Sequence, residues 1–286
     1  MIFKYKSLKD QAILEFLNSF HLSKSKIYTL FLDKRILIND KECKREDKIN
    51  KDDIVSIIEN EDIDFIPENK KLDIIYEDDY LLIVNKPSNI IVHPDDKNKL
   101  GSMCNIVANY YKNRGYDLSV KYAHRLDIDT TGILIFCKDM LTMAYMNYHI
   151  SLHNVKRTYQ CLCEGIFKDK KGTINLAIGE DRHHKQRRRV SKTGQAAITN
   201  YEVIKEFKNY SLVSVLLETG RTHQIRVHLS HIGHSLLGDE LYYSNKKLIK
   251  RVALHSYMVE FIHPVTNELI KLVKKLPFDM QNLVGR

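Results

Sequence analysis

The stretch HRLDIDTTGILIFCKD, residues His124 to Asp139, decides the fold because it joins an acid-rich loop to a continuous apolar strand. Its second half, TGILIFCKD, has the apolar run of a buried strand, and Gly132 lets the chain enter that strand tightly. The first half must then be a loop held at a strand end, where rigid scaffolds place reactive side chains. Asp127 and Asp129 could equally shape a turn, and the loop alone does not decide between these roles.

Strand patterns dominate the chain around this stretch from Leu72 onward, with helical patterns between some of them. Strands are expected at LDIIYED, YLLIVNK, NIIVHP, GILIFCK, RTYQCLCEGI, GTINLAI, AAITNYEVIKEF and YSLVSVLLETG, and helices at SMCNIVANYYKN, DMLTMAYMNYHISLHN and RTHQIRVHLSHIG. Several of the strands follow one another through short turns. We therefore predict an α+β domain with a mixed, mostly antiparallel sheet rather than a doubly wound parallel sheet.

A smaller unit precedes this domain. Ser7 can cap a helix whose apolar positions run to Phe20, Ser23 can cap a second helix, and short strands are expected at ILIN and DIVSII. The acidic segment that follows contains a proline, which favours a linker. We predict a small α/β domain over residues 1–62, a linker over 63–71 and the larger domain over 72–286.

The charge of the chain points to a polyanion as partner. The formal net charge is +9, and basic residues cluster in RHHKQRRRVSK, Arg182 to Lys192. A solvated basic face without a partner is the alternative. The five cysteines form no CxxC pair, so a reducing, cytoplasmic location is expected. No segment has the apolar length of a bilayer span or of a secretory signal, so no membrane association is expected.

A second segment that could carry chemistry is LLETGRTHQIRVHLSHIGHSLLGDELY, Leu216 to Tyr242. Thr219 or Thr222 can cap a helix there, and the helix N-terminus with Arg221 would form a positive end that suits a carboxylate or a phosphate. The histidines at 223, 228, 231 and 234 lack an HExxH pattern and a Cys/His cluster. We therefore expect no metal site.

Six motifs in order resemble one family. The series NKPSNIIVHP, HRLDIDTTGILIFCKD, KRTYQCLCEG, ETGRTHQIRVHL, GDELYY and ALHSYMVEFIHPVT is similar to the RluA-type pseudouridine synthases, which isomerise specific uridines in ribosomal or transfer RNA. The resemblance runs from about Leu72 to Pro277 and implies the pseudouridine synthase fold. Residues 1–62 separately resemble the S-four-type RNA-binding module, which often precedes such catalytic domains.

The resemblance implies roles for three catalytic residues. Asp127, the acid of HRLD, would be the carboxylate beside the uridine, and Arg221 would keep it ionised through charge and hydrogen bonding. Tyr159 would lie against the uracil face. Whether Asp127 attacks the sugar, adds to the uracil ring or removes a ribose proton stays open. The isomerisation needs neither a redox change nor a group donor, so no cofactor is expected.

RNA contacts follow from the same resemblance and from the basic residues. Arg125 would help to fill the stack that a flipped-out uridine leaves. The further predicted contacts are His124, Lys24, Lys26, Arg35, Arg182, Arg187, Arg188 and Arg189. The S-four-type module favours ribosomal over transfer RNA, and a monomer is expected. The alternatives are a catalytically inactive RNA-binding or ribosome-assembly protein on the same fold, and a nucleoside hydrolase or metal-dependent enzyme of another fold.

Overall fold

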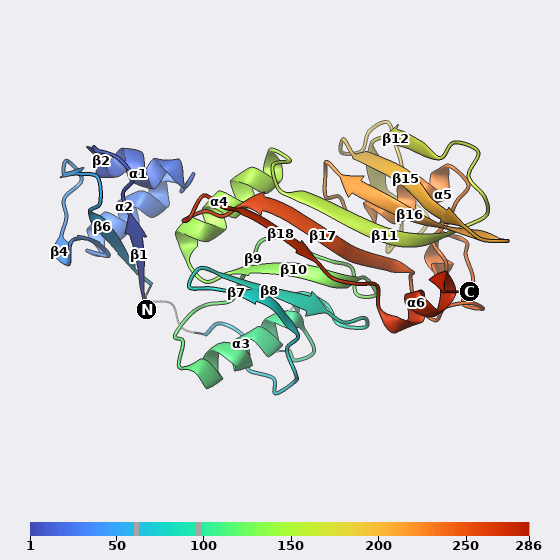
Figure 1. Cartoon of the computed structure of the whole chain (residues 1–286), viewed down its shortest axis with the longest axis horizontal. Coiled ribbons are helices and arrows are strands. Elements are labelled where there is room, and N and C mark those ends of the chain that lie inside the picture. The colour runs from blue at the N-terminus through green and yellow to red at the C-terminus, as the bar shows by residue number, and fades with distance from the viewer. Residues whose placement is uncertain (60–62, 95–98, 286) are drawn as a thin grey trace.

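The computed structural model describes residues 1–59, 63–94 and 99–285, and it places two units along one long axis (Figure 1). The first unit is built on a four-stranded sheet in the order β1-β6-β3-β4, covered by two helices. Its elements are β1 (Ile2–Lys6), β2 (Gln11–Ala12), α1 (Ile13–Ser19), α2 (Lys24–Leu32), β3 (Ile36–Ile38), β4 (Lys41–Glu42), β5 (Lys48–Ile49) and β6 (Ile54–Ile58).

The helix pair of this unit confirms one predicted cap and corrects the other. Ser23 caps α2, because its side chain accepts a hydrogen bond from the backbone N–H of Lys26. Ser7 does not cap α1, since its hydroxyl donates to the carbonyl of Lys9 and the helix begins only at Ile13. The residues before Ser7 form the strand β1 instead, which pairs with β6 in the middle of the small sheet.

The second unit is built on a ten-stranded sheet, and the predicted α+β class with a mostly antiparallel sheet is confirmed. Its strands are β7 (Ile74–Glu77), β8 (Leu81–Lys86), β9 (Lys121–Tyr122), β10 (Thr131–Cys137), β11 (Lys156–Glu164), β12 (Lys171–Asn175), β15 (Ile198–Glu206), β16 (Tyr210–Leu217), β17 (Leu254–Ile262) and β18 (Leu269–Val273). The main path runs β12-β15-β16-β11-β17-β10-β8-β7. Among the strand pairs of the described residues, only β10 with β17 is parallel.

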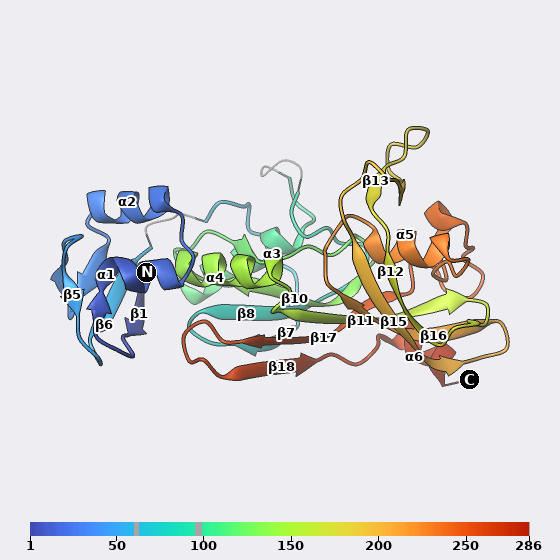
Figure 2. The ribbon, with the colours of Figure 1, turned by 90° about the horizontal axis from the view of Figure 1, so that it is seen from above.

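Helices and a hairpin complete this unit. They are α3 (Met103–Arg114), α4 (Met140–Ser151), the hairpin strands β13 (Ile178–Glu180) and β14 (Arg188–Val190), α5 (Gln224–His231), the 3₁₀ turn η1 (Glu240–Tyr242) and α6 (Phe278–Val284). Viewed from above the first orientation, α4 and α5 lie on the same side of the large sheet, and the β13–β14 hairpin projects on that side (Figure 2). The segment NIIVHP forms only an isolated bridge at Ile91, so the strand predicted there is wrong.

Strand β10, the apolar half of the opening stretch, lies at the centre of the packing. Every residue from Thr131 to Cys137 is buried. Gly132 has φ +107°, and a Cβ atom there would stand 2.2 Å from the carbonyl oxygen of Ser256 on β17. Only glycine allows this parallel strand to approach so closely. The loop before β10 is therefore anchored at the end of a strand, as predicted, and this strand lies inside the sheet between β17 and β8.

Direct side-chain contacts join the two units. Asp139 is the N-cap of α4, accepts hydrogen bonds from the backbone of Leu141 and Thr142, and is also bonded by the hydroxyl of Tyr5 on β1. Glu59, at the end of the small unit, accepts a hydrogen bond of 2.6 Å from the backbone N–H of Met140. Burial raises the pKa of Asp139. Asp139 is thus a structural acid, far from a free surface.

Candidate active site

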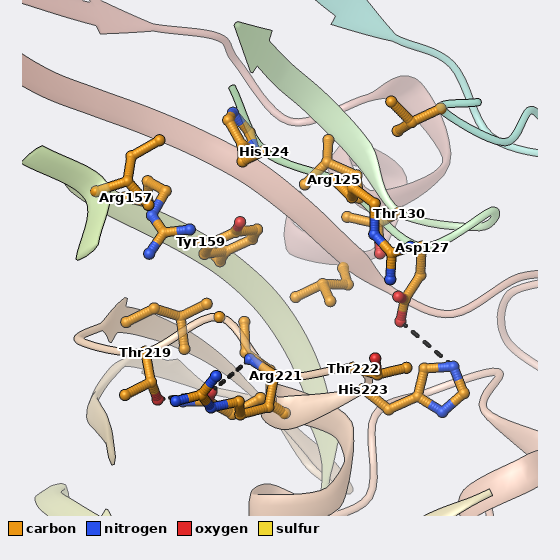
Figure 3. A pocket seen from close by; sticks show the side chains of 18 of the residues that line it. His124, Arg125, Asp127, Thr130, Arg157, Tyr159, Thr219, Arg221, Thr222 and His223 are labelled. Atoms are coloured by element: carbon orange, nitrogen blue, oxygen red, sulfur yellow. Dashed lines mark hydrogen bonds and ion pairs between the residues drawn. The ribbon is translucent and has the colours of Figure 1, made fainter. Parts of the chain in front are cut away.

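A pocket of about 710 Å³ opens between the loop before β10, strand β11 and the N-terminal end of α5 (Figure 3). All three residues predicted to be catalytic, Asp127, Tyr159 and Arg221, line it. His124 and Arg125 line it as well. The fold therefore brings together motifs that lie almost a hundred residues apart in the sequence.

The Asp127 loop is held by its backbone from three sides. The carbonyl of Asp127 accepts a hydrogen bond from the N–H of Thr130, which closes a turn. Lys86, the lysine of the NKP motif, is fully buried and donates to the carbonyl of Ile128 at 2.9 Å. Arg251 reaches the carbonyl of Asp129 at 3.3 Å. The loop is a rigid support, so the carboxylate of Asp127 has a defined position over the pocket.

The cation that pairs with Asp127 is Arg226 rather than Arg221. Arg226 Nη1 lies 3.2 Å from Asp127 Oδ2, and Arg226 holds Asp239 through Nε at 2.6 Å and Nη2 at 2.8 Å. Burial opposes its charge, but the bonds with Asp239 outweigh that effect and raise the pKa of Arg226. The ring of Tyr242 lies 5.0 Å from the guanidinium carbon. A permanently charged group is thus fixed beside the acid.

The predicted ion pair between Arg221 and Asp127 is wrong because of the turn that precedes α5. His223 takes a left-handed conformation with φ +58°, and the helix begins at Gln224 with no side-chain cap from Thr219 or Thr222. Gln224 Oε1 instead accepts from the backbone N–H of Arg221. The exposed guanidinium of Arg221 then donates to the carbonyl of Ala196 at 3.0 Å. Arg226 sits further along the helix, on the side that faces Asp127.

His223 is a second neighbour of the acid. Its Nε2 lies 3.8 Å from Asp127 Oδ2 (Figure 3). Its Nδ1 lies 3.0 Å from the hydroxyl of Tyr242. Burial lowers the pKa of His223. The imidazole is therefore neutral at neutral pH, and the charge that balances Asp127 comes from Arg226.

Tyr159 lies on β11 with its side chain buried at the pocket wall, 4% exposed. Burial raises the pKa of its phenol above the ordinary value. A phenol with a raised pKa is a weaker acid still, so its deprotonated form is scarce at neutral pH. Tyr159 therefore offers a flat aromatic ring beside Asp127, on which a nucleobase could stack.

The other two polar residues of the HRLD motif lie in different environments. Arg125 is exposed, and its Nη1 lies 3.4 Å from His93 Nε2. His124 is buried in the pocket wall, which leaves it out of reach of a passing RNA surface unless the RNA enters the pocket. Burial, with Arg157 nearby, lowers the pKa of His124 to about 3.

The other predicted RNA contacts divide by exposure. Lys24 and Lys26 are exposed on α2, and Arg182 and Arg189 are exposed on the β13–β14 hairpin. Arg187 is paired with Asp181 at 2.6 Å, and Arg188 with Glu180 at 3.2 Å. Arg35 points inward, where Nε donates to the carbonyl of Ile58 at 2.6 Å and Nη2 lies 3.6 Å from Glu59. Arg35 is therefore a structural residue and not a surface contact, which corrects its predicted role.

Three residues of the site were not singled out from the sequence. Arg226 and Asp239 belong to the quoted motifs GRTHQIRVHL and GDELYY, and Lys86 to NKP. The histidines of the α5 segment are structural in part, since His228 is buried and contacts Thr199 Oγ1 and the Leu176 carbonyl. In residues 1–59, 63–94 and 99–285, no group of three or more His, Cys, Asp or Glu side chains could hold a metal ion.

Comparison with known proteins gives a consistent result. The family model described as RNA pseudouridylate synthase matches residues 80–231. The chain is 45% identical over 206 residues to uncharacterized RNA pseudouridine synthase YhcT of Bacillus subtilis (strain 168), covering 71% of this chain and 68% of that protein. It is 32% identical over 292 residues to ribosomal large subunit pseudouridine synthase D of Salmonella typhimurium, covering 96% and 89%.

A solved structure supports the fold. The human RNA pseudouridylate synthase domain containing 4 protein aligns with a TM-score of 0.62 at 22% identity, over 74% of this chain and 92% of that one. At this identity the likeness concerns the fold alone. It agrees with the mixed, mostly antiparallel sheet of this chain.

Proposed function

This chain belongs to the RNA pseudouridylate synthase family, and from that premise we propose that it isomerises a uridine of large-subunit ribosomal RNA through Asp127. The observation that carries the proposal is the ion pair between Asp127 and Arg226 beside the ring of Tyr159 in one pocket. The ribosomal substrate is inferred from the Salmonella ribosomal large subunit pseudouridine synthase D, which matches nearly the whole chain. Free thiols and a ribosomal substrate favour action in the cytoplasm.

The proposed chemistry needs an ionised carboxylate. The N1–C1′ bond of the uridine breaks, the uracil turns, and C5 joins C1′ while a proton leaves C5 and N1 gains one. Asp127 can attack the sugar, add to the ring or remove a ribose proton, and each route starts from the ionised form. Arg226 keeps it in that form, and Asp239 holds Arg226 in place. Preorganised charges of this kind act without reorganisation when the reaction begins.

The remaining pocket residues would position the RNA. A uridine reaches the pocket only when it is flipped out of its stack, at a cost of about a few kcal/mol. Tyr159 would lie against the flipped base, and the exposed Arg125 would fill or stabilise the vacated stack. These roles follow from the burial of Tyr159 and the exposure of Arg125 at the pocket mouth.

The surfaces beside the pocket would bind the phosphate backbone. Arg182 and Arg189 on the hairpin are exposed, and the S-four-type module over residues 1–62 offers Lys24 and Lys26 on α2. We treat residues 72–286 as the catalytic domain and 63–71 as its linker. Removal of Lys24 and Lys26 charges should weaken RNA binding at low salt without changing the melting temperature.

Mapping of pseudouridines in cellular RNA with and without the gene tests the function directly. We expect loss of one or a few pseudouridines in large-subunit ribosomal RNA, restored by the wild-type chain and not by Asp127→Asn. Restoration by Asp127→Asn would remove Asp127 from the chemistry, while an unchanged ribosomal map with loss in transfer RNA would redirect the substrate. An active wild type and an inactive Asp127→Asn that still binds RNA also exclude the inactive-protein alternative.

A further inference from the structure

A buried arginine at the other end of the pocket has no partner. Arg157, on β11 two residues before Tyr159, is 5% exposed and lines the pocket. Its Nε has no hydrogen-bond partner, and within the described part of the chain its guanidinium joins no ion pair. Glu218, which also lines the pocket, instead accepts a hydrogen bond from Asn200 at 2.8 Å.

The other buried arginines of the described residues are all paired. Arg226, 8% exposed, holds Asp239 with two nitrogens, and Arg251, 7% exposed, holds Asp279 at 2.7 and 2.9 Å. A buried guanidinium without an anion loses its hydration and gains nothing in return, so such a group is rare. The unpaired Arg157 is therefore best explained by an anion that comes from outside the protein.

His124 is a second unpartnered group beside Arg157. It is 7% exposed, and neither Nδ1 nor Nε2 has a hydrogen-bond partner. The nearby charge of Arg157, together with burial, disfavours its protonation. Both ring nitrogens of His124 are shielded from solvent, so the guanidinium of Arg157, rather than the imidazole, is the donor that a group entering the pocket can meet.

Arg157 lies in the same pocket as the candidate catalytic acid. Arg157 and Tyr159 are alternate residues of one strand, which places them on the same face about 6.5 Å apart along it. In the close-up, Arg157 and Asp127 lie on opposite sides of Tyr159 (Figure 3). A nucleotide whose base lies on Tyr159 and whose sugar reaches Asp127 would not occupy the Arg157 end of the pocket. A neighbouring part of the RNA could bind there.

We propose that Arg157 forms a subsite for a backbone phosphate of the RNA next to the target uridine. A phosphate supplies the negative charge that Arg157 lacks, and its oxygens match the fork of the guanidinium. A neutral uracil carbonyl would leave the charge uncompensated. This inference rests on the proposed function only in that RNA enters the pocket.

Salt-dependent binding tests the subsite without catalysis. The slope of log Kd against log salt is measured with a single-stranded oligouridylate for wild type, Arg157→Gln, Arg157→Lys and Arg114→Gln. Each phosphate contact to a single strand contributes about 0.7 to the slope, so Arg157→Gln should lower it by about 0.7. Arg157→Lys should retain the slope, and Arg114→Gln, whose exposed side chain lies on α3, should not change it. Equal slopes for wild type and Arg157→Gln, or failure of the wild type to bind, would overturn the proposal.

Thermal stability separates this subsite from a structural role. Because Arg157 is unpaired in the free protein, Arg157→Gln should melt at the same temperature as wild type or higher. A structural arginine would lower the melting temperature when removed. A fall of more than a few degrees would therefore overturn the proposal.

Kinetics on the RNA that contains the mapped uridine complete the test. Arg157→Gln should raise KM roughly tenfold or more, with a much smaller change in kcat. A fall in kcat with unchanged KM would mean that Arg157 acts on the departing uracil, which would overturn the phosphate assignment. Wild type that is inactive on every RNA would instead contradict the proposed function, and the binding slopes would still decide the subsite.

Discussion

The two ends of the pocket differ in how their charges are balanced. At the acid end, formed by Asp127, His223, Arg226 and Asp239, the guanidinium of Arg226 has a carboxylate on two sides. At the arginine end, formed by His124 and Arg157, the buried guanidinium lies near a neutral imidazole and makes no ion pair within the described residues. Both ends lie in one continuous pocket around Tyr159.

This difference in charge balance corresponds to a difference in role: the acid end takes part in the reaction, whereas the arginine end binds a ligand. The acid end is assembled before any ligand arrives, so the ionised carboxylate costs no reorganisation during the reaction. The arginine end is left electrostatically incomplete and stays so until a ligand supplies negative charge. A protein gives up stability in such a place, as is common where function needs an unsatisfied group.

The largest expected effect comes from breaking the acid end at Arg226. Arg226→Lys removes the fork that bonds Asp239 and Asp127 together, so we expect kcat to fall by about 10² or more. Arg221→Lys, the matched control, should change kcat only a few-fold because Arg221 donates to the Ala196 carbonyl. The measurement is single-turnover pseudouridine formation. Equal losses in both variants would show that the ion pair with Arg226 does not govern the reaction.

The sequence placed the acid correctly in its loop but not the partner of the acid. Arg221 and Arg226 share one motif and both follow the same glycine, so the residues alone did not separate them. The choice depends on the left-handed turn at His223, which starts the helix late and turns Arg226 toward Asp127. Such a turn at a non-glycine residue is set by tertiary contacts, which a local pattern does not contain.

A moderate effect is expected where the backbone of the acid end is anchored. Lys86 Nζ donates to the carbonyls of Pro87, Ile90 and Ile128, and thereby ties the NKP turn to the Asp127 loop. Lys86→Met leaves three backbone carbonyls without this donor. We expect kcat to fall about tenfold and the melting temperature to drop by several degrees. A normal kcat in a destabilised variant would show that the loop keeps its position without Lys86.

The fold was more predictable than the site for a physical reason. Strands β8 and β10 each contain an unbroken run of buried apolar residues, which can be recognised directly in the sequence. The strand β1 was missed because its alternation of apolar and basic residues in FKYK is short and adjoins a helical pattern. The unpaired state of Arg157 was equally invisible, since pairing depends on which side chains the sheet brings near it.

The smallest effect concerns the arginine end and appears only in acid. His124 has its pKa lowered to about 3 by burial and by Arg157, against about 6.5 in an unfolded chain. Between these values the unfolded state binds the extra proton, so stability falls as pH falls from 6.5 toward 3. At pH 5 this amounts to about 2 kcal/mol, from 1.5 pH units at about 1.4 kcal/mol each.

His124→Gln removes that proton-linked loss, so its free energy of unfolding should decrease less than that of wild type between pH 7.5 and 5. Urea unfolding at the two pH values measures the difference. His255→Gln is the matched comparison, because burial lowers the pKa of His255 to about 4 at a site where its Nδ1 and Nε2 both have partners. His255→Gln should also reduce the fall in the free energy of unfolding between pH 7.5 and 5, but it should lower the stability at pH 7.5 because two hydrogen bonds are lost. His124→Gln should not lower the stability at pH 7.5, because His124 has no such partners. If His124→Gln loses stability in acid as steeply as wild type, His124 is not the source of the acid-linked loss, and the arginine end does not have the pH dependence that its burial predicts.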